Sequence, residues 1–355
     1  MPSSWNTKFT KRFPCQLPIV GAPMAGTSGG LLAAETCRAG ALGFIAAGHT
    51  TSLDEIDRQV TIFRDKAPAD ASLAVGFIGH STFSNPDSWD RFERVLKKHQ
   101  PKVVQFFAPA IAIRCSDGKT NVNVAHDYQC QVLAQVGNVA EGLQALEAGV
   151  DGLIAQGSEA GGHGLRPGLG KGTLALAARL VTLTKDTPVP VLAAGGIVDG
   201  RGVSAALALG CGGAVLGTRL WASKEALGHA SFKELLASPF NGPDQVVRST
   251  VIDHIANSYS STPWPVPYDS VGMLENETSK EWESRRTDLE VALFSESAVA
   301  SKYKKAVAEG DPQIAQVYSG QGVGDIHSID PAYDVIVRIN EEAISIVRSM
   351  PQLLD

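Results

Sequence analysis

Between residues 18 and 216, short runs of apolar residues recur along the chain. They predict eight strands, at residues 18–22, 42–47, 73–78, 103–107, 132–136, 152–155, 191–194 and 213–216. Most of these runs are continuously apolar and do not alternate with polar residues, which is typical of parallel strands covered on both faces. The pattern therefore favours a buried, parallel sheet.

Segments with helical spacing separate these runs. Apolar residues recur three or four positions apart at residues 30–39, 52–64, 87–98, 140–148 and 173–183. Strand and helix therefore alternate repeatedly, which predicts an α/β fold of the (β/α)8 TIM-barrel type. A doubly wound open sheet is the competing architecture. The fourth unit is the weakest, because residues 111–123 lack a clean helical stripe.

The pattern changes from about residue 225 onward. Prolines and aromatics cluster in STPWPVPYDS, and longer polar helical stretches follow at residues 279–290 and 298–309. An amphipathic helix at residues 331–350 ends the chain and has an apolar stripe that could pack on the barrel. We expect residues 1–224 and 320–355 to form the barrel, and residues 225–319 to form a mostly helical cap over the substrate.

Charge and cysteine usage narrow the possible functions. The 355 residues carry a formal net charge of -6, with no run of Lys or Arg longer than a pair, so we expect no nucleic-acid partner. No stretch approaches the roughly 20 apolar residues of a spanning helix, and the first residues lack a leader pattern, so we expect a cytoplasmic protein without a membrane partner. The oligomeric state stays open.

Five cysteines occur without a C-x-x-C pair. We expect them to be small buried hydrophobes, with no disulfide framework and no metal site. They are Cys15, Cys37, Cys115, Cys130 and Cys211.

Glycines follow the seventh and eighth predicted strands. Gly195 and Gly196 stand after the seventh strand, and Gly217 with Thr218 stands after the eighth. In a (β/α)8 barrel, phosphate groups favour these two loops, where glycines leave backbone N–H groups exposed. The segments therefore predict a phosphate site, although glycines at such positions can also simply turn tight corners.

Two further strand ends carry unusual chemistry. The loop QGSEAGGHG after the sixth strand surrounds His163 with glycines, and an imidazole in that setting is a natural general base. Glu159 in this loop either accepts backbone N–H bonds or faces solvent. After the first strand, Met24 either lies against a flat aromatic ligand or belongs to the core.

The motifs at these strand ends resemble those of the nitronate monooxygenase family, formerly called 2-nitropropane dioxygenases. The matching segments are APMAG, QGSEAGGH, AAGGIVDGRG and AVLGTRLWAS, in the family's order, together with the closing YSGQGVGDI. The resemblance covers most of residues 15–225 and about the last forty residues. It implies an FMN-dependent (β/α)8 barrel.

The resemblance also implies a role for each matching residue. His163 would be the catalytic base. The residues implied to bind FMN are the backbone of Ala22, Pro23 and Met24 and the side chain of Gln135 at the ring or ribityl chain, then Gln156, Gly161 and Gly162, and Gly195, Gly196, Gly217 and Thr218 at the phosphate. After the third strand, many bacterial members carry an Asn, whereas this chain has Gly79 and His80, and either of these would supply the contact.

The implied reaction oxidises an alkyl nitronate with FMN and O2 and gives a carbonyl compound and nitrite. His163 would remove the proton from a neutral nitroalkane, or hold a nitronate anion in its charged form. Two alternatives remain: an NAD(P)H-dependent reductase of quinones or enoyl thioesters on the same barrel, and a flavin-binding protein without turnover. The chain shows no separate G-x-G-x-x-G dinucleotide motif, which mildly disfavours the reductase.

The cap also contains aromatic residues that could lie over the flavin. For each of them, packing inside the cap is the alternative role. The candidates are Tyr259, Trp264, Tyr268 and Tyr303.

Overall fold

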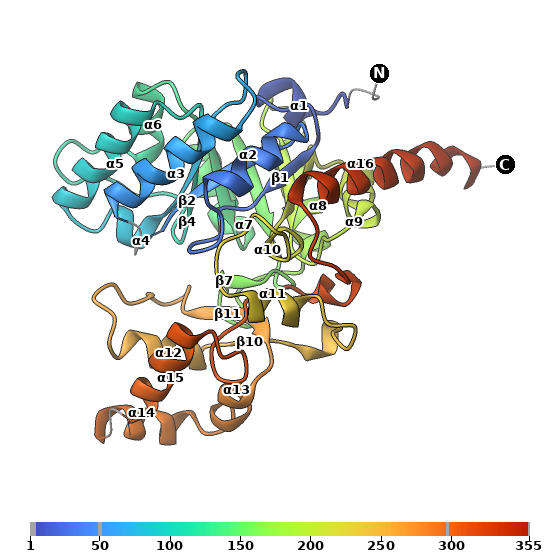
Figure 1. The fold of residues 1–355 in the computed structure, drawn as a ribbon. Helices are drawn as coiled ribbons and strands as arrows, with labels where there is room; N and C mark the ends of the chain where they lie inside the picture. The colour runs from blue at the N-terminus through green and yellow to red at the C-terminus, as the bar shows by residue number, and fades with distance from the viewer. Residues whose placement is uncertain (1–4, 49–51, 296–297, 354–355) are drawn as a thin grey trace.

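A closed barrel of eight parallel strands forms the centre of the molecule (Figure 1). The structure is a computed structural model that describes residues 5–48, 52–295 and 298–353. The strands are β1 (Ile19–Gly21), β2 (Leu42–Ala47), β3 (Ala74–Ile78), β4 (Val103–Phe107), β5 (Gln131–Val136), β6 (Gly152–Gln156), β8 (Val191–Ala194) and β9 (Gly213–Leu216). Since β9 pairs with β1 and closes the sheet, the (β/α)8 prediction is confirmed and the open sheet is wrong.

The barrel interior is filled by side chains and closed at its N-terminal end. Val20, Leu133 and Ile154 belong to one buried apolar cluster inside the barrel. The short helix α1 (Lys8–Arg12) adds Phe9, and the Phe9 and Phe13 rings stack 5.0 Å apart against this cluster. Full burial of one such ring contributes about 2 kcal/mol to folding. The barrel is therefore open to a ligand only at the opposite end.

Helices cover the outside of the barrel. Buried apolar faces of α2, α3, α5 and α8 pack on the strands, as their spacing predicts. The C-terminal helix α16 packs against α9 and α2, and Glu342 accepts a hydrogen bond from Gly200 N at 2.7 Å. The helices are α2 (Gly30–Arg38), α3 (Leu53–Lys66), α4 (Gly79–Thr82), α5 (Pro86–His99), α6 (Asn121–Asp127), α7 (Val139–Glu147), α8 (Thr173–Leu183), α9 (Gly200–Ala208), α10 (Thr218–Trp221) and α16 (Ala332–Ser349).

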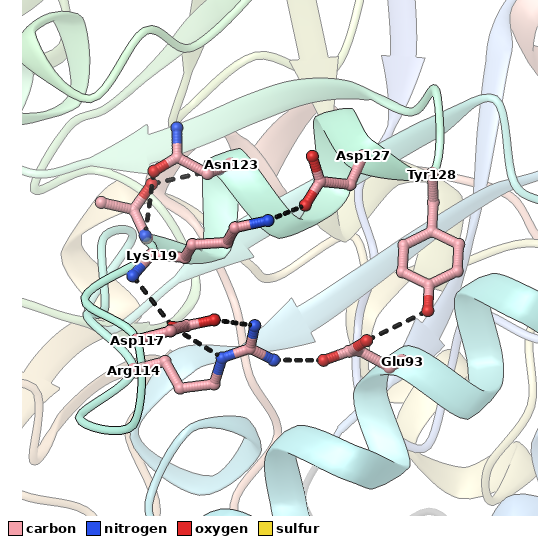
Figure 2. Close-up of polar contacts among 8 residues, drawn as sticks. Glu93, Arg114, Asp117, Lys119, Asn123, Asp127 and Tyr128 are labelled. Carbon is pink, nitrogen blue, oxygen red and sulfur yellow. Dashed lines mark hydrogen bonds and ion pairs between the residues drawn. The ribbon is translucent and has the colours of Figure 1, made fainter.

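The fourth unit contains only a short helix, α6, in agreement with its weak helical pattern. The long connection before α6 is tied to α5 by side-chain contacts (Figure 2). Arg114 contacts Glu93 on α5, which also accepts a hydrogen bond from the Tyr128 hydroxyl at 3.0 Å. Lys119 pairs with Asp127 at 2.6 Å. Polar contacts therefore order a segment that lacks the apolar stripe of a longer helix.

The segment between β9 and α16 forms a layer at one end of the barrel (Figure 1). Its strands β10 and β11 form a small antiparallel sheet of order β10-β11-β7 with a strand that follows β6, and the expectation of a mostly helical cap did not include this sheet. Its elements are α11 (Ala230–Leu236), η1 (Pro243–Gln245), β10 (Val246–Ser249), α12 (Val251–Asn257), β11 (Ser270–Leu274), α13 (Glu277–Trp282), α14 (Arg286–Ser295), α15 (Ala298–Glu309) and η2 (Gln321–Asp325). The prediction of one continuous helix at residues 279–290 is wrong. The structure has two helices there, because α13 ends at Trp282 and α14 begins at Arg286.

The strand β7 (Gly162–Gly164) connects this layer to the barrel. It follows β6 directly, and it pairs with β11, so that His163 lies opposite Val271. The layer therefore covers the C-terminal end of the barrel strands, where barrel enzymes carry their active sites. We propose residues 225–319 as the cap of this mouth.

The structure also bears on the expectations for the cysteines and for membrane-spanning helices. All five cysteines are free. Cys130 and Cys211 are buried, Cys15 and Cys37 are half-buried, and Cys115 is exposed, so the expectation of burial is wrong for Cys115. It lies in the connection between β4 and α6, which runs over the surface. Across the described residues, no helix is long and apolar enough to span a bilayer, and no group of three or more His, Cys, Asp or Glu side chains is arranged to hold a metal ion.

Candidate active site

The loop between β6 and β7 has a fixed conformation. Gln156, the last residue of β6, donates a hydrogen bond from Nε2 to the carbonyl of His163 at 2.9 Å. The Glu159 carboxylate accepts the backbone N–H of Thr173 at 2.8 Å, at the first residue of α8. Of the two roles expected for Glu159, backbone capping is therefore confirmed, and solvent exposure is wrong.

Arg248 on β10 holds the same loop from the cap side. Its guanidinium donates to the carbonyls of Ala160 at 2.5 Å and of Ser158 and Gly162 at 3.4 Å each. Burial lowers the pKa of Arg248 to about 10, against the opposing effect of the Glu159 charge. The sequence does not predict this role, because nothing near position 248 marks an arginine that binds carbonyls 90 residues earlier.

His163 lies between the loop and the cap. Its Nε2 is 3.0 Å from Oδ1 of Asp253 on α12, and its side chain is 13% exposed. The imidazole stacks on the indole of Trp264, with ring centroids 3.6 Å apart and an angle of 12° between the planes. The imidazole is therefore held on one edge and one face, and does not point into bulk solvent.

Trp264 is the cap aromatic that reaches this imidazole. The indole also approaches the ring of His80, with centroids 4.5 Å apart. The adjoining Gly79 is packed so tightly that a Cβ would lie 2.0 Å from the carbonyl oxygen of Pro109. The segment after β3 thus brings His80 to the barrel mouth beside the cap.

The other cap aromatics have different environments. Tyr268 donates from its hydroxyl to Glu141 at 2.7 Å, and burial raises its pKa. Tyr303 is buried within the cap and contacts Gln316. Tyr259 is 40% exposed and has Lys304 over its ring at 5.1 Å. Since none of these three has a ring contact with His163 among the described residues, Trp264 is the strongest candidate for the wall of the site.

Tyr318 is a second aromatic side chain close to His163. Its centroid lies 5.7 Å from that of the imidazole. Burial raises the pKa of the Tyr318 phenol, and the charge of Asp253 raises it further. The hydroxyl therefore stays protonated, and it accepts a hydrogen bond from Gln316 Nε2 at 3.2 Å.

The predicted phosphate corners lie beside the closing segment at residues 319–322. Gly195 and Gly196 have φ values of 126° and 70°, which side-chain-bearing residues rarely adopt. Thr218 Oγ1 accepts the N–H of Gly320 at 3.0 Å. A Cβ on Gly322 would lie 2.4 Å from the carbonyl oxygen of Gly196. The two corners and the closing segment therefore form one continuous surface.

Glycines 161 and 162 continue this surface toward His163. A Cβ on Gly161 would lie 2.6 Å from the carbonyl carbon of Ser319, so the two backbones touch there. Gly162 has a φ of 69° and starts β7. A side chain at Gly161 would therefore collide with the backbone of Ser319, and one at Gly162 would have room but a strained left-handed φ.

The segment after β1 is held in place by Ser28. Its hydroxyl donates to the carbonyl of Ala22 at 2.8 Å and accepts the N–H of Met24 at 3.1 Å. Pro23 packs against β3, because a Cβ on Gly76 would lie 2.3 Å from the Pro23 Cβ. Met24 is half-buried and packs on the core, with its sulfur facing the Gly217 corner.

Three glutamines line the barrel just below this mouth. Side chains alternate along a strand, so Gln105, Gln135 and Gln156 follow the interior residues Val103, Leu133 and Ile154 on adjacent strands. Gln105 Nε2 donates to Gln135 Oε1 at 2.7 Å. Gln105 was not among the predicted site residues, although a single glutamine within the apolar run VVQFF indicates a polar position inside the barrel.

Comparison with known proteins identifies the family. The sequence model of the family described as nitronate monooxygenase matches residues 6–342. The chain belongs to the nitronate monooxygenase family. This family is flavin-dependent, and its members are oxidoreductases.

Full-length relatives and solved structures agree with this placement. A nitronate monooxygenase of Neurospora crassa is 33% identical over 361 residues, covering 95% of this chain and 92% of the relative. Nitronate monooxygenase npaC of Metarhizium robertsii is 27% identical, covering 94% and 92%. A nitroalkane oxidase structure from Streptomyces ansochromogenes matches with a TM-score of 0.74 at 25% identity, over 97% of this chain and all of that one.

The structure of FabK from Thermotoga maritima has the same fold. It matches with a TM-score of 0.75 at 24% identity, over 99% of this chain and 100% of that chain. At this identity the match supports the nitronate monooxygenase barrel as a fold, and it carries no information about the reaction.

Proposed function

We propose that this chain oxidises alkyl nitronates and nitroalkanes with O2, using FMN, and releases a carbonyl compound and nitrite. Family membership supports the nitronate chemistry. The main structural support for this proposal is the position of the His163 imidazole, which lies at the barrel mouth between Asp253 and Trp264. When bound, the flavin supplies the electron transfer that makes the nitronate reactive toward O2.

The residues at the mouth fit such a flavin. Gln105 Oε1 is buried without a hydrogen-bond partner among the described residues, so a donor from a ligand would satisfy it. A Cβ on Gly217 would have no atom closer than Met24 Sδ at 3.9 Å, so this corner opens onto free space. An unpaired acceptor in the barrel and an open glycine corner at its rim are what the ring and the phosphate of FMN require.

Each group of predicted residues has a part in holding FMN. The corners at Gly195 and Gly217 offer backbone N–H groups to the phosphate, as parallel barrels commonly do. The ring would lie against the segment after β1 and over the glutamines of β5 and β6. The full set is Ala22, Pro23, Met24, Gln135, Gln156, Gly161, Gly162, Gly195, Gly196, Gly217 and Thr218.

His163 acts on the substrate. For a neutral nitroalkane, the imidazole removes the proton next to the nitro group, which a positioned base accelerates about 10²- to 10⁴-fold. For a nitronate, the charged imidazole binds the anion. Trp264 shields the imidazole from water on one face, so that either interaction takes place in a site with little competing solvent.

The test separates this function from its alternatives. Purified protein is loaded with FMN, and flavin reduction is followed anaerobically after addition of ethylnitronate or, separately, NADPH. Rapid bleaching by the nitronate alone supports the proposal. Bleaching by NADPH alone would instead indicate a reductase of quinones or enoyl thioesters, and bleaching by neither would indicate a flavin-binding protein without turnover.

A His163→Asn variant tests the assigned base. We expect it to keep FMN and to lose about 10²-fold or more in kcat on nitroethane. His254→Asn is the matched control, because His254 lies on α12 and faces Glu290 at 3.6 Å. Turnover of nitroethane by the His163 variant at the parent rate would remove His163 from the mechanism.

A further inference from the structure

Asp253 is a buried carboxylate with one hydrogen bond. It lies on α12 (Val251–Asn257) and is 2% exposed. Its Oδ1 is 3.0 Å from His163 Nε2, and its Oδ2 has no partner among the described residues. A buried carboxylate in an apolar layer is costly unless it is paired. The position therefore requires a reason beyond packing.

The surroundings of Asp253 leave the imidazole as its partner. Its neighbours on α12, Val251 and Ile252, belong to the apolar core of the cap. The ionisable groups that face it from other elements are the phenols of Tyr303 on α15 and Tyr318; burial raises the pKa of both, and the charge of Asp253 raises it further. In the described parts of the chain, no Lys or Arg side chain forms an ion pair with it.

The same helix also positions the ring that covers the imidazole. Asn257 lies one turn after Asp253 and therefore on the same face of α12. Its side-chain oxygen accepts a hydrogen bond from the backbone N–H of Trp264 at 2.8 Å, and its side-chain nitrogen donates to the backbone carbonyl of Trp264 at 3.1 Å. One face of α12 thus holds the edge of the imidazole directly and its stacking partner through two hydrogen bonds.

We infer that Asp253 is a positioning residue that sets the tautomer of His163. The carboxylate can only accept, so Nε2 carries the hydrogen and Nδ1 carries the lone pair. Nδ1 has no hydrogen bond to a described residue, which leaves it for the substrate. This inference rests on the proposed function, in which His163 removes a proton from a nitroalkane.

In the proton transfer, His163 Nδ1 accepts the proton of the substrate. The C–H bond next to the nitro group breaks, its electron pair stays on the substrate as the nitronate, and the proton forms a new bond to Nδ1. Nε2 keeps its hydrogen throughout, directed at Asp253 Oδ1. The imidazolium that results is paired with the carboxylate, in the way that an aspartate supports the imidazolium of a hydrolase triad.

A kinetic comparison tests this role. In Asp253→Asn, the amide can donate to Nε2 and so stabilise the other tautomer, which places the hydrogen on Nδ1. We expect kcat for nitroethane to fall about 10²-fold or more, kcat for ethylnitronate to fall much less, and the FMN dissociation constant to change less than about threefold. Asp253→Glu should recover part of the nitroethane rate. Glu290→Gln is the control for a carboxylate elsewhere in the cap.

Equal losses on both substrates, or none, would overturn the inference. A second measurement avoids dependence on a variant that folds poorly. In the FMN-loaded parent protein labelled with ¹⁵N-histidine, the His163 signals are assigned from their absence in His163→Asn. A hydrogen on Nε2 of the neutral ring supports the inference, and a hydrogen on Nδ1 overturns it. Because this measurement needs no turnover, it separates failure of the positioning role from failure of the proposed activity.

Discussion

A methyl group at position 217 would test where the phosphate of FMN binds. Gly217 precedes α10 with a φ of -105° and a ψ of -85°, which lies outside the left-handed region but also outside the main α and β regions, so alanine carries some backbone strain there. The nearest atom to an added Cβ is Met24 Sδ at 3.9 Å, so the protein itself has room for the methyl group. Since that room is the proposed phosphate site, Gly217→Ala should weaken FMN binding and destabilise the apoprotein only modestly.

The size of the effect follows from one lost contact. A hydrogen bond to a charged group contributes about 1.5–3 kcal/mol, and about 1.4 kcal/mol corresponds to a tenfold change in affinity. Displacing one phosphate oxygen from the corner therefore predicts an FMN dissociation constant about 10- to 100-fold higher. The free energy of unfolding of the apoprotein should fall by about 1–2 kcal/mol, because alanine is strained at this φ and ψ.

The assay is a titration of apoprotein with FMN, followed by the loss of flavin fluorescence, beside urea unfolding of the apoprotein. Gly170→Ala is the control, because its Cβ would make an ordinary contact with Leu165 at 3.6 Å, in the loop before α8. A Gly217 variant that binds FMN as tightly as the parent would refute the phosphate assignment. A variant whose apoprotein loses much more stability than this backbone strain explains would show that the corner has no free space.

Two further substitutions test the supports of the site and of the barrel. Arg248→Leu should lower the free energy of unfolding by about 2 kcal/mol, because buried carbonyls of the loop before β7 lose their donor; an unchanged urea midpoint would contradict this. Burial raises the pKa of Asp151, but hydrogen bonds from His126, Val132 N and Arg12 bring it below its usual value. Its stabilisation is therefore present above about pH 4 and is lost as the pH falls through the lowered pKa. Asp151→Asn should lower unfolding free energy by about 1–3 kcal/mol at neutral pH, and this deficit should narrow on acidification; a deficit independent of pH would count against the ion pairs.

Local periodicity was sufficient for the barrel. All eight predicted strands occur, and β2, β4, β8 and β9 have the predicted bounds. Continuous apolar runs are typical of parallel strands covered on both faces, and such a run can be recognised within a few residues. The prediction was weaker where polar contacts replaced an apolar stripe, as at Arg114 and Glu93 before α6.

The sequence predicted only some of the residues of the candidate site. The glycine-rich setting of His163 marked it as a candidate base, because glycines at a strand end are a local signal. Asp253 carries no such signal, since it stands in an apolar helix, and Trp264 was one of four cap aromatics among which the sequence did not choose. Their importance comes from contacts across 90 and 101 positions of the chain.

The order of apolar runs and glycine corners along the chain thus determined the barrel, its open end and the family to which it belongs. Which side chains meet at that end was decided by tertiary structure alone. β7 leaves the barrel and joins β11, and this pairing brings His163 to α12. A hydrogen bond between distant residues depends on how whole elements pack, and a pattern read within a few residues contains no record of that packing.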